Sequence, residues 1–389
     1  MKMNQVYTIL NTITGEILGD TAIVQEDLSN IVDIGRAIQN AAGVDNFVRK
    51  LTDHIGKVVF DYRVYAGRAP RLLMDGWEFG SICEKIRADL PAATENESWE
   101  LTDGQTYDPN IFYKPSVSVK FFNDRVTFEV PISITEMQVK SAFSSAAQMN
   151  GFMSMILNAV QNSMTVKIDA LIMRTINAGI GETIHNEFAD GNYNSDSGVR
   201  AVNLLYLYNQ TVPAAQALTA AAAIHDSDFI RFASFTIKNY VDRMQDMSKL
   251  FNVGGTAKFT PADRMHIVML SEFKNAAEIY LYDGVNQFNT DNVRLPANVE
   301  TVSYWQGSGL SYAFADTSAI NIKTPSGDTV SVTGILGVVF DRDAMGVCNL
   351  DRRVTTDYNA KAEFFNQWHK FDAGYFLDLD ENIVVFFVA

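Results

Sequence analysis

Residues 149–171, MNGFMSMILNAVQNSMTVKIDAL, hold the longest regular hydrophobic pattern of the chain and therefore decide its fold. The apolar positions that recur are Met149, Met153, Ile156, Val160, Met164, Ile168 and Leu171. Their mean spacing of about 3.7 residues is that of a straight helix with one buried face, rather than the 3.5 of a left-handed coiled coil. We predict a helix over about 146–178, roughly 50 Å long. Methionines at such positions are adaptable core residues.

Alternating apolar residues precede this helix. Val117, Val119 and Phe121 alternate with polar residues, and so do the apolar residues of 126–134. A period of two predicts half-buried strands, and Asn123-Asp124 between them predicts a tight turn that joins the two as a hairpin. Thr135-Glu-Met-Gln138 then fits a capping box, which predicts a helix start, and Ser145 with Gln148 repeats it.

Residues 67–115 are rich in proline and glycine and contain the acidic stretch Glu95–Asp103. Strands on its flanks indicate an organised, projecting loop rather than disorder. Such a charged segment buries too little apolar area to offset its own ordering entropy, so a neighbouring subunit is expected to supply the missing surface. Composition alone leaves a mobile surface flap equally open. The inter-subunit contact residues that we predict are Trp77, Glu95, Glu97, Trp99, Glu100 and Asp103.

The rest of the chain mixes helices with short strands, which makes the fold class α+β. Helical periodicity predicts a pair of short N-terminal helices, which are either an arm or ordinary packing, and a helix capped by Asp226 that runs on to Phe251. Thr260-Pro261 has the chemistry of another helix start. The other predicted elements are strands at 266–270, 299–305, 320–323, 329–332, 335–340 and 383–388 and a helix at 272–282.

Composition excludes several classes of protein. The 389 residues are 47% hydrophobic and 20% charged, which is ordinary for a folded protein of two or three packed units. A net charge of −15 argues against tight DNA binding, which needs cationic side chains. Cys83 and Cys348 lie too far apart for a disulfide framework or a thiolate zinc site. The N-terminus lacks a signal-peptide pattern, and the apolar runs are shorter than the ~18 residues that a membrane helix needs.

The sequence carries no recognisable catalytic motif, so we predict no catalytic, cofactor-binding or metal-binding residues and no cofactor. The five histidines are dispersed, and there is no phosphate-binding loop or nucleophile elbow. Asp190–Asp196 resembles half of a calcium loop but lacks its glycine and glutamate, so we expect a solvated turn there. For Asp378, Asp380 and Glu381 we favour exposure to solvent over a cation site.

The order of these elements resembles the major capsid proteins of tailed bacteriophages, which have the Hong Kong 97 fold. Short segments of the sequence are most similar to those of the capsid proteins of picovirus-type short-tailed phages. The segments that carry the resemblance are Trp77-Glu-Phe-Gly80, Ala92–Trp99, Ile111–Pro115, Leu250–Gly255, Tyr304–Gly309, Phe340–Gly346, Phe364-Phe-Asn366, Lys370 and Ala373–Phe376. Each is weak alone, but their order covers nearly the whole chain.

The resemblance implies an N-terminal arm at 1–56, an extended loop at 57–134 and a peripheral domain with the spine helix at 135–225. An axial domain with returning peripheral strands would occupy 226–389. It further implies a virion capsid protein, made in the host bacterial cytoplasm, that is not an enzyme. Copies of the chain would form hexamers and pentamers and close an icosahedral shell around double-stranded DNA without gripping it.

The partners implied are other copies of the chain, a portal protein and a separate scaffolding protein, because no long scaffolding segment precedes the arm; no membrane is expected. Two alternatives remain at this point. An encapsulin-type nanocompartment shell would keep the fold and enclose a cargo enzyme. A cytosolic α+β hydrolase is disfavoured by the missing motifs, although catalytic residues can converge from distant positions.

Overall fold

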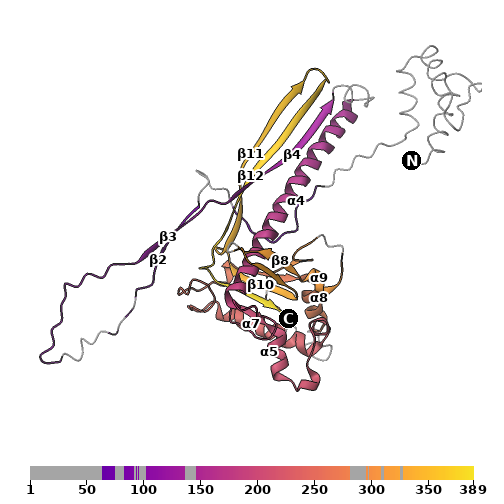
Figure 1. Ribbon diagram of the computed structural model, residues 1–389. Helices are drawn as coiled ribbons and strands as arrows, with labels where there is room; N and C mark the ends of the chain where they lie inside the picture. The colour runs from indigo at the N-terminus through magenta and orange to yellow at the C-terminus, as the bar shows by residue number, and fades with distance from the viewer. Residues whose placement is uncertain are drawn as a thin grey trace, which may run out of the picture. The chain divides into compact units, whose positions relative to one another are not determined.

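The structure is a computed structural model, and it describes residues 64–74, 83–91, 93, 95, 102–135, 146–280, 295–296, 298–307, 311–324 and 327–389 (Figure 1). The predicted N-terminal helices and the predicted helix starts at 135–138 and 145 lie wholly or partly outside these residues. The chain divides into two compact units. One consists of residues 1–65, 130–163 and 354–369, and the other of 66–129, 164–353 and 370–389.

The spine helix α4, Ala146–Glu187, is the longest helix described, with 42 residues. Its predicted start is confirmed, and its end lies nine residues beyond the predicted one. Val160, Met164 and Leu171 of the predicted apolar stripe are buried. The buried stripe continues beyond Leu171, its last predicted residue, since Ile176, Ile180 and Ile184 are also fully buried.

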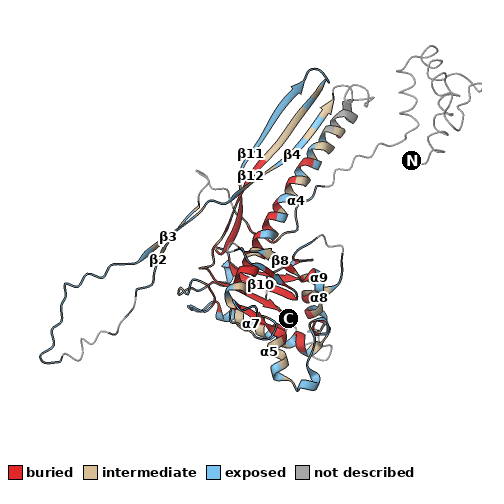
Figure 2. Cartoon of the chain, viewed as in Figure 1, coloured by how far each residue is buried: buried red, intermediate tan, exposed pale blue. Residues whose placement is uncertain are grey.

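A five-stranded sheet of order β5-β13-β10-β6-β7 forms the core of the second unit. Its strands are β5 Ala201–Asn203, β6 Met265–Leu270, β7 Val299–Val302, β10 Ile335–Asp341 and β13 Ile383–Phe387. Every residue of β10 and β13 is buried, as the red strands of Figure 2 show. β10 pairs antiparallel with both β6 and β13, whereas β5 and β7 join the edges in parallel. The strands predicted at 266–270, 335–340 and 383–388 are therefore confirmed.

A second sheet has the order β1-β11-β12-β4. Its strands are β1 Leu73–Met74, β4 Arg125–Thr135, β11 Met345–Asn359 and β12 Phe364–Leu377. β11 and β12 were not predicted from the sequence. The second half of β11 is exposed and most of the first half of β12 is half-buried, and neither half has an alternating apolar pattern. Each of β4, β11 and β12 contributes residues to both compact units.

The predicted pairing of 117–121 with 126–134 is wrong, although both strands exist. β3, Val117–Phe122, pairs antiparallel with β2, Cys83–Ala88, from the far side of the loop. β4 instead lies beside β12. The turn at Asn123-Asp124 therefore passes the chain from one sheet to another. β12 helps to fix this passage, since the amide of Tyr375 donates to the carbonyl of Asp124.

Shorter elements complete the second unit. They are α5 Leu204–Thr211, α6 Ala220–Ala223, α7 Ser227–Arg243, α8 Ser271–Tyr280, α9 Phe314–Thr317, the 3-10 turns η2 Ala214–Gln216 and η3 Ala262–Arg264, and the paired strands β8 Ile320–Lys323 and β9 Thr329–Val332. Asp226 caps α7 as predicted, accepting from the amides of Asp228 and Phe229. The helix ends earlier than predicted because the carbonyl of Met244 accepts from the amide of Thr260, which turns the chain back. Thr260-Pro261 starts only a 3-10 turn.

Candidate assembly surface

The strands β2 and β3 lie side by side and lead into a long loop of residues 89–116 (Figure 1). We call the two strands and this loop the assembly hairpin. The side chains of β2 alternate between half-buried and exposed, so the ladder has two distinct faces. Phe122, on the half-buried face, packs at 5.4 Å between ring centroids against Phe376 of β12. This face of the hairpin therefore contacts the rest of the second unit, to which the hairpin itself belongs.

The attached face is cationic and meets three carboxylates of the turn before β13. We call residues 378–381 the carboxylate turn. Lys85 Nζ lies 2.7 Å from Asp378 and 2.5 Å from Glu381. Lys120 Nζ lies 2.9 Å from Asp378 and 2.6 Å from Asp380. Arg87 reaches Asp380 at 3.4 Å, and Lys258 joins Glu381 at 2.5 Å. Four cations from three segments therefore converge on one acidic turn.

These ion pairs shift the pKa values of their members. Burial alone would raise the pKa of Asp378, but hydrogen bonds from Lys85 and Lys120 outweigh burial, so the pKa lies below its ordinary value. Burial alone would likewise lower the pKa of Lys85, yet its bonds to Asp378 and Glu381 raise it. Asp378 and Lys85 are therefore held in their charged forms, because each lies against partners of the opposite charge.

The opposite face of the hairpin is exposed and, apart from Glu84, apolar, whereas the exposed face of a surface strand is ordinarily polar. Ile86 and Val119 stand opposite each other in the register, and they are 66% and 44% exposed. Phe121 is 65% exposed on the same face. A row of exposed branched and aromatic side chains is typical of a surface that another protein covers.

The described part of the loop continues this exposure. Every described residue from Ala88 to Val117 is exposed. Phe112 and Tyr113 are 85% and 81% exposed, and Ile111 and Tyr107 are more than half exposed. The apolar area of the loop is therefore not buried by the described residues of its own chain.

The predicted contact residues lie in this loop or just before it, but the structure describes only two of them. Glu95 and Asp103 are exposed. Trp77, Glu97, Trp99 and Glu100 lie outside the described residues. Sequence reasoning missed Ile86, Val119 and Phe121 as exposed residues. The alternation of Val119 and Phe121 was interpreted as half-burial within one chain, and alternation cannot distinguish a face that packs on its own chain from one that packs on another. The strand that holds Ile86 was not predicted.

The prediction that Asp378, Asp380 and Glu381 face solvent is wrong. Asp378 and Glu381 are only 2% and 5% exposed, and lysines pair with them. The sequence alone does not show that Lys85 pairs with Asp378, because the two residues lie 293 positions apart. Among the described residues no group of three or more His, Cys, Asp or Glu side chains has the arrangement of a metal site.

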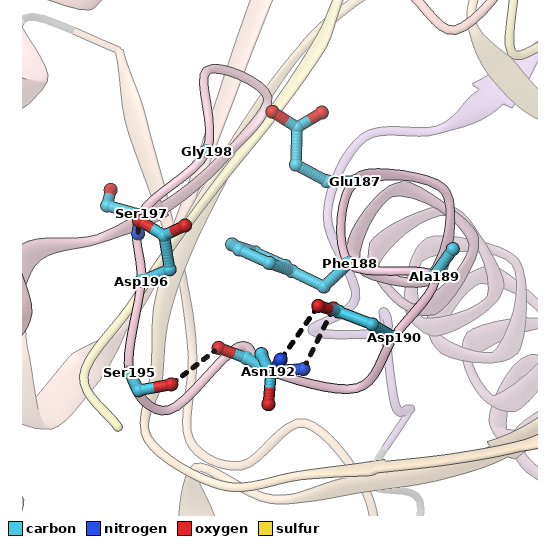
Figure 3. Close-up of a pocket in the computed structure, with 9 residues that line it drawn as sticks. All are labelled: Glu187, Phe188, Ala189, Asp190, Asn192, Ser195, Asp196, Ser197 and Gly198. Carbon is cyan, nitrogen blue, oxygen red and sulfur yellow. Dashed lines mark hydrogen bonds between the residues drawn. The ribbon is translucent and has the colours of Figure 1, made fainter.

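The acidic segment Asp190–Asp196 is a solvated turn, as predicted. Together with the end of α4 it lines an open pocket of about 590 Å³ (Figure 3). The carboxylate of Asp190 accepts from the backbone and side-chain amides of Asn192, which lowers its pKa. Glu187, on the pocket wall, pairs with Arg200 at 2.6 Å and accepts from the amide of Val199. The charges of this pocket thus fasten the end of α4 to β5.

No helix among the described residues has the length and hydropathy to cross a membrane. A comparison with the curated proteins found no match.

The solved structures that resemble this chain share its fold, which is of the Hong Kong 97 type. A chain of the capsid structure of Staphylococcus phage Andhra matches with a TM-score of 0.54 at 10% identity, over 86% of this chain and 87% of that one. A chain in the structure of the head fiber and inner core protein gp22 of native bacteriophage P68 gives a TM-score of 0.49 at 10% identity, over 86% and 88%. The first of these shows the shared fold.

Sequence comparison then gives the family. Residues 9–387 match the Phi29-like phage major capsid protein family. The chain belongs to that family, and it is a shell protein of a phage capsid, built from multiple copies of the chain. The resemblance to tailed-phage capsid proteins inferred from the sequence is confirmed. These matches give no support to a nanocompartment shell or a hydrolase.

Proposed function

We propose that copies of this chain join into hexamers and pentamers through the assembly hairpin, and that these close an icosahedral shell around double-stranded DNA. The apolar face of the hairpin carries the proposal, with Ile86, Val119 and Phe121 exposed. Burying these side chains against a neighbour would stabilise assembly by roughly 25 cal/mol per Å² of apolar area removed from water. The protein acts by building the shell rather than by catalysing a reaction.

The contact combines this apolar face with the loop. Phe112 and Tyr113 would supply aromatic anchors, a residue type enriched at interfaces. Glu95 and Asp103, with the predicted Trp77, Glu97, Trp99 and Glu100, would add polar contacts around them. A mobile flap would not need its exposed side chains to be apolar.

The charge of the chain suits containment of DNA. At a net charge of −15 the inner wall would repel the phosphate backbone, which favours sliding during packaging over tight binding. A scaffolding protein and a portal protein are the further partners that we propose, with synthesis in the cytoplasm of the bacterial host. The proposed domains are the arm 1–56, extended loop 57–134, peripheral domain 135–225 and axial domain 226–389.

A shortened hairpin tests the proposal. Replacing residues 90–115 with Asn-Gly keeps both strands and gives them a two-residue turn that suits antiparallel pairing. Leu72 is buried and β1 pairs with β11, so a larger deletion that reached residue 72 would damage the core. We expect the variant to keep its melting temperature and to form no shells in negative-stain electron micrographs when co-expressed with its scaffold.

A point variant supplies the finer test. Phe112→Ser/Tyr113→Ser retains the length of the loop and removes both aromatic anchors, and we expect shell yield to fall at least tenfold. Lys114→Met is the matched control, since it changes a neighbouring exposed residue and should leave the yield unchanged. Intact shells from the shortened hairpin would refute the role of the loop.

A further inference from the structure

The two strands of the assembly hairpin place like charges opposite each other. Lys85 and Lys120 are direct partners in the antiparallel register of β2 and β3. Like charges at directly opposed positions destabilise a two-stranded ladder, and an isolated ladder of two strands is at best marginally stable. The hairpin therefore does not hold this pair together by itself.

Asp378 removes the repulsion by accepting from both lysines. Lys85 donates to Oδ2 at 2.7 Å, and Lys120 donates to Oδ1 at 2.9 Å. The carboxylate is only 2% exposed, so it is stable in the charged form only while such partners remain. One buried side chain thus binds both strands of the hairpin at the same position along their length.

The carboxylate turn is itself fixed to the core. The amide of Asp378 donates to the carbonyl of Ala344 at 2.6 Å, and that of Val253 donates to the carbonyl of Leu379 at 2.9 Å. The side-chain amide of Asn252 donates a buried hydrogen bond to the side-chain oxygen of Asn382 at 3.3 Å. A Cβ at Gly254 would collide with the Asp380 carboxyl group, so the turn and the segment before it approach as closely as glycine allows.

We propose that Asp378 is the positioning residue of the assembly hairpin, in that it clamps Lys85 and Lys120 and so fixes the direction in which the hairpin leaves the core. The inference rests on the proposed function, because direction matters only if the hairpin reaches a neighbour. A clamp of this kind pre-organises the contact surface, which lowers the entropy lost when two copies join. Without it, the face of the ladder would rest on Phe122 and on the pairs that its cations make with Asp380 and Glu381.

The direction of the hairpin is measurable in the unassembled subunit. Spin labels at Ala88→Cys, at the end of β2, and Lys238→Cys, on the exposed side of α7, report the distance by double electron–electron resonance. The background carries Cys83→Ser, and Cys348 is buried. We expect a narrow distance distribution in this background. The triple variant Lys85→Met/Lys120→Met/Asp378→Asn removes the clamp without leaving a buried charge unpaired, and its distribution should be at least twofold wider.

Two controls separate positioning from general damage. Lys114→Met makes the same type of change outside the clamp and should leave the distribution narrow. Lys85→Arg/Lys120→Arg retains the charges and should keep most of the narrow distribution, which a role in packing alone would not predict. If the triple variant unfolds, the single variant Lys120→Met replaces it as the test, because that lysine is 43% exposed and we expect its removal to leave the fold intact.

An unchanged distribution in a folded triple variant, or in folded Lys120→Met if the triple variant unfolds, would overturn the inference. That result would leave the proposed function standing if the shortened hairpin still formed no shells. Conversely, shells formed by the shortened hairpin would refute the role of the loop in the proposed function even if the distance distribution widened. The two readouts are independent, because one measures a single subunit and the other an assembled particle.

Discussion

Asp378 and Glu182 are both buried carboxylates with different surroundings. Asp378 accepts from two lysines, whereas one carboxylate oxygen of Glu182 has no hydrogen-bond partner among the described residues. Burial raises the pKa of Glu182, and His185 one turn away lowers it only in part. The sequence shows neither environment, since both carboxylates depend on contacts formed by the tertiary fold.

Glu182→Gln is expected to stabilise the subunit at neutral pH by on the order of 1 kcal/mol, because it removes a buried charge with an unpaired oxygen. The pKa of Glu182 is higher in the folded state than in the unfolded state. The destabilisation caused by its buried charge is therefore complete above the pKa of the folded state. It disappears as the pH falls, because the carboxyl group gains a proton. The stabilisation by Glu182→Gln, measured as the free energy of unfolding in urea, should therefore be smaller at pH 4 than at pH 7.

The control for this measurement is Glu95→Gln, which removes an exposed charge and should change stability little at either pH. A loss of stability at pH 7 in Glu182→Gln would contradict the account of its charge.

At the scale of elements, the spacing of apolar residues predicted the buried face of a single helix or strand. It did not predict which strands pair when they lie far apart in the sequence. The stripe of α4 followed from spacing alone, and so did the buried β10 and β13. The pairing of β3 with β2 did not, because Asn123-Asp124 is as suitable for a crossing between sheets as for a hairpin. The exposed second half of β11 and the half-buried first half of β12 have no alternating apolar pattern to detect.

A close approach between α4 and β8 gives a prediction at this scale. A Cβ at Gly181 would meet the side chain of Ile322, with its Cγ1 at 2.7 Å. Gly181→Ala should therefore destabilise the subunit by about 1–2 kcal/mol, although alanine favours a helix over glycine by about 1 kcal/mol. Thermal or urea unfolding measures the difference.

A double-mutant cycle isolates this contact. In an Ile322→Ala background the space is free, so Gly181→Ala should become neutral or stabilising. Equal destabilisation in both backgrounds would show that the cost has another origin. The same helix offers Gly179 as a comparison, where a Cβ would meet the flexible end of Met345, so a milder effect is expected.

At the scale of the whole molecule, the resemblance in sequence predicted the family, and the exposed surface explains what the chain does with its fold. Local patterns identified an unusual loop and placed contacts on its acidic and tryptophan residues. They did not identify the apolar outer face of the hairpin, since burial by a second copy leaves the same alternation as burial within one chain.

The central claim is that this surface touches another copy of the same chain, and photochemical crosslinking from Phe112 tests it most directly. A photoreactive phenylalanine analogue at that position is incorporated into shells made from a mixture of isotopically light and heavy subunits. The account predicts efficient crosslinks that join light to heavy peptides in shells and not in free subunits. Intact shells whose crosslinks remain within single chains, or that yield none, would contradict it.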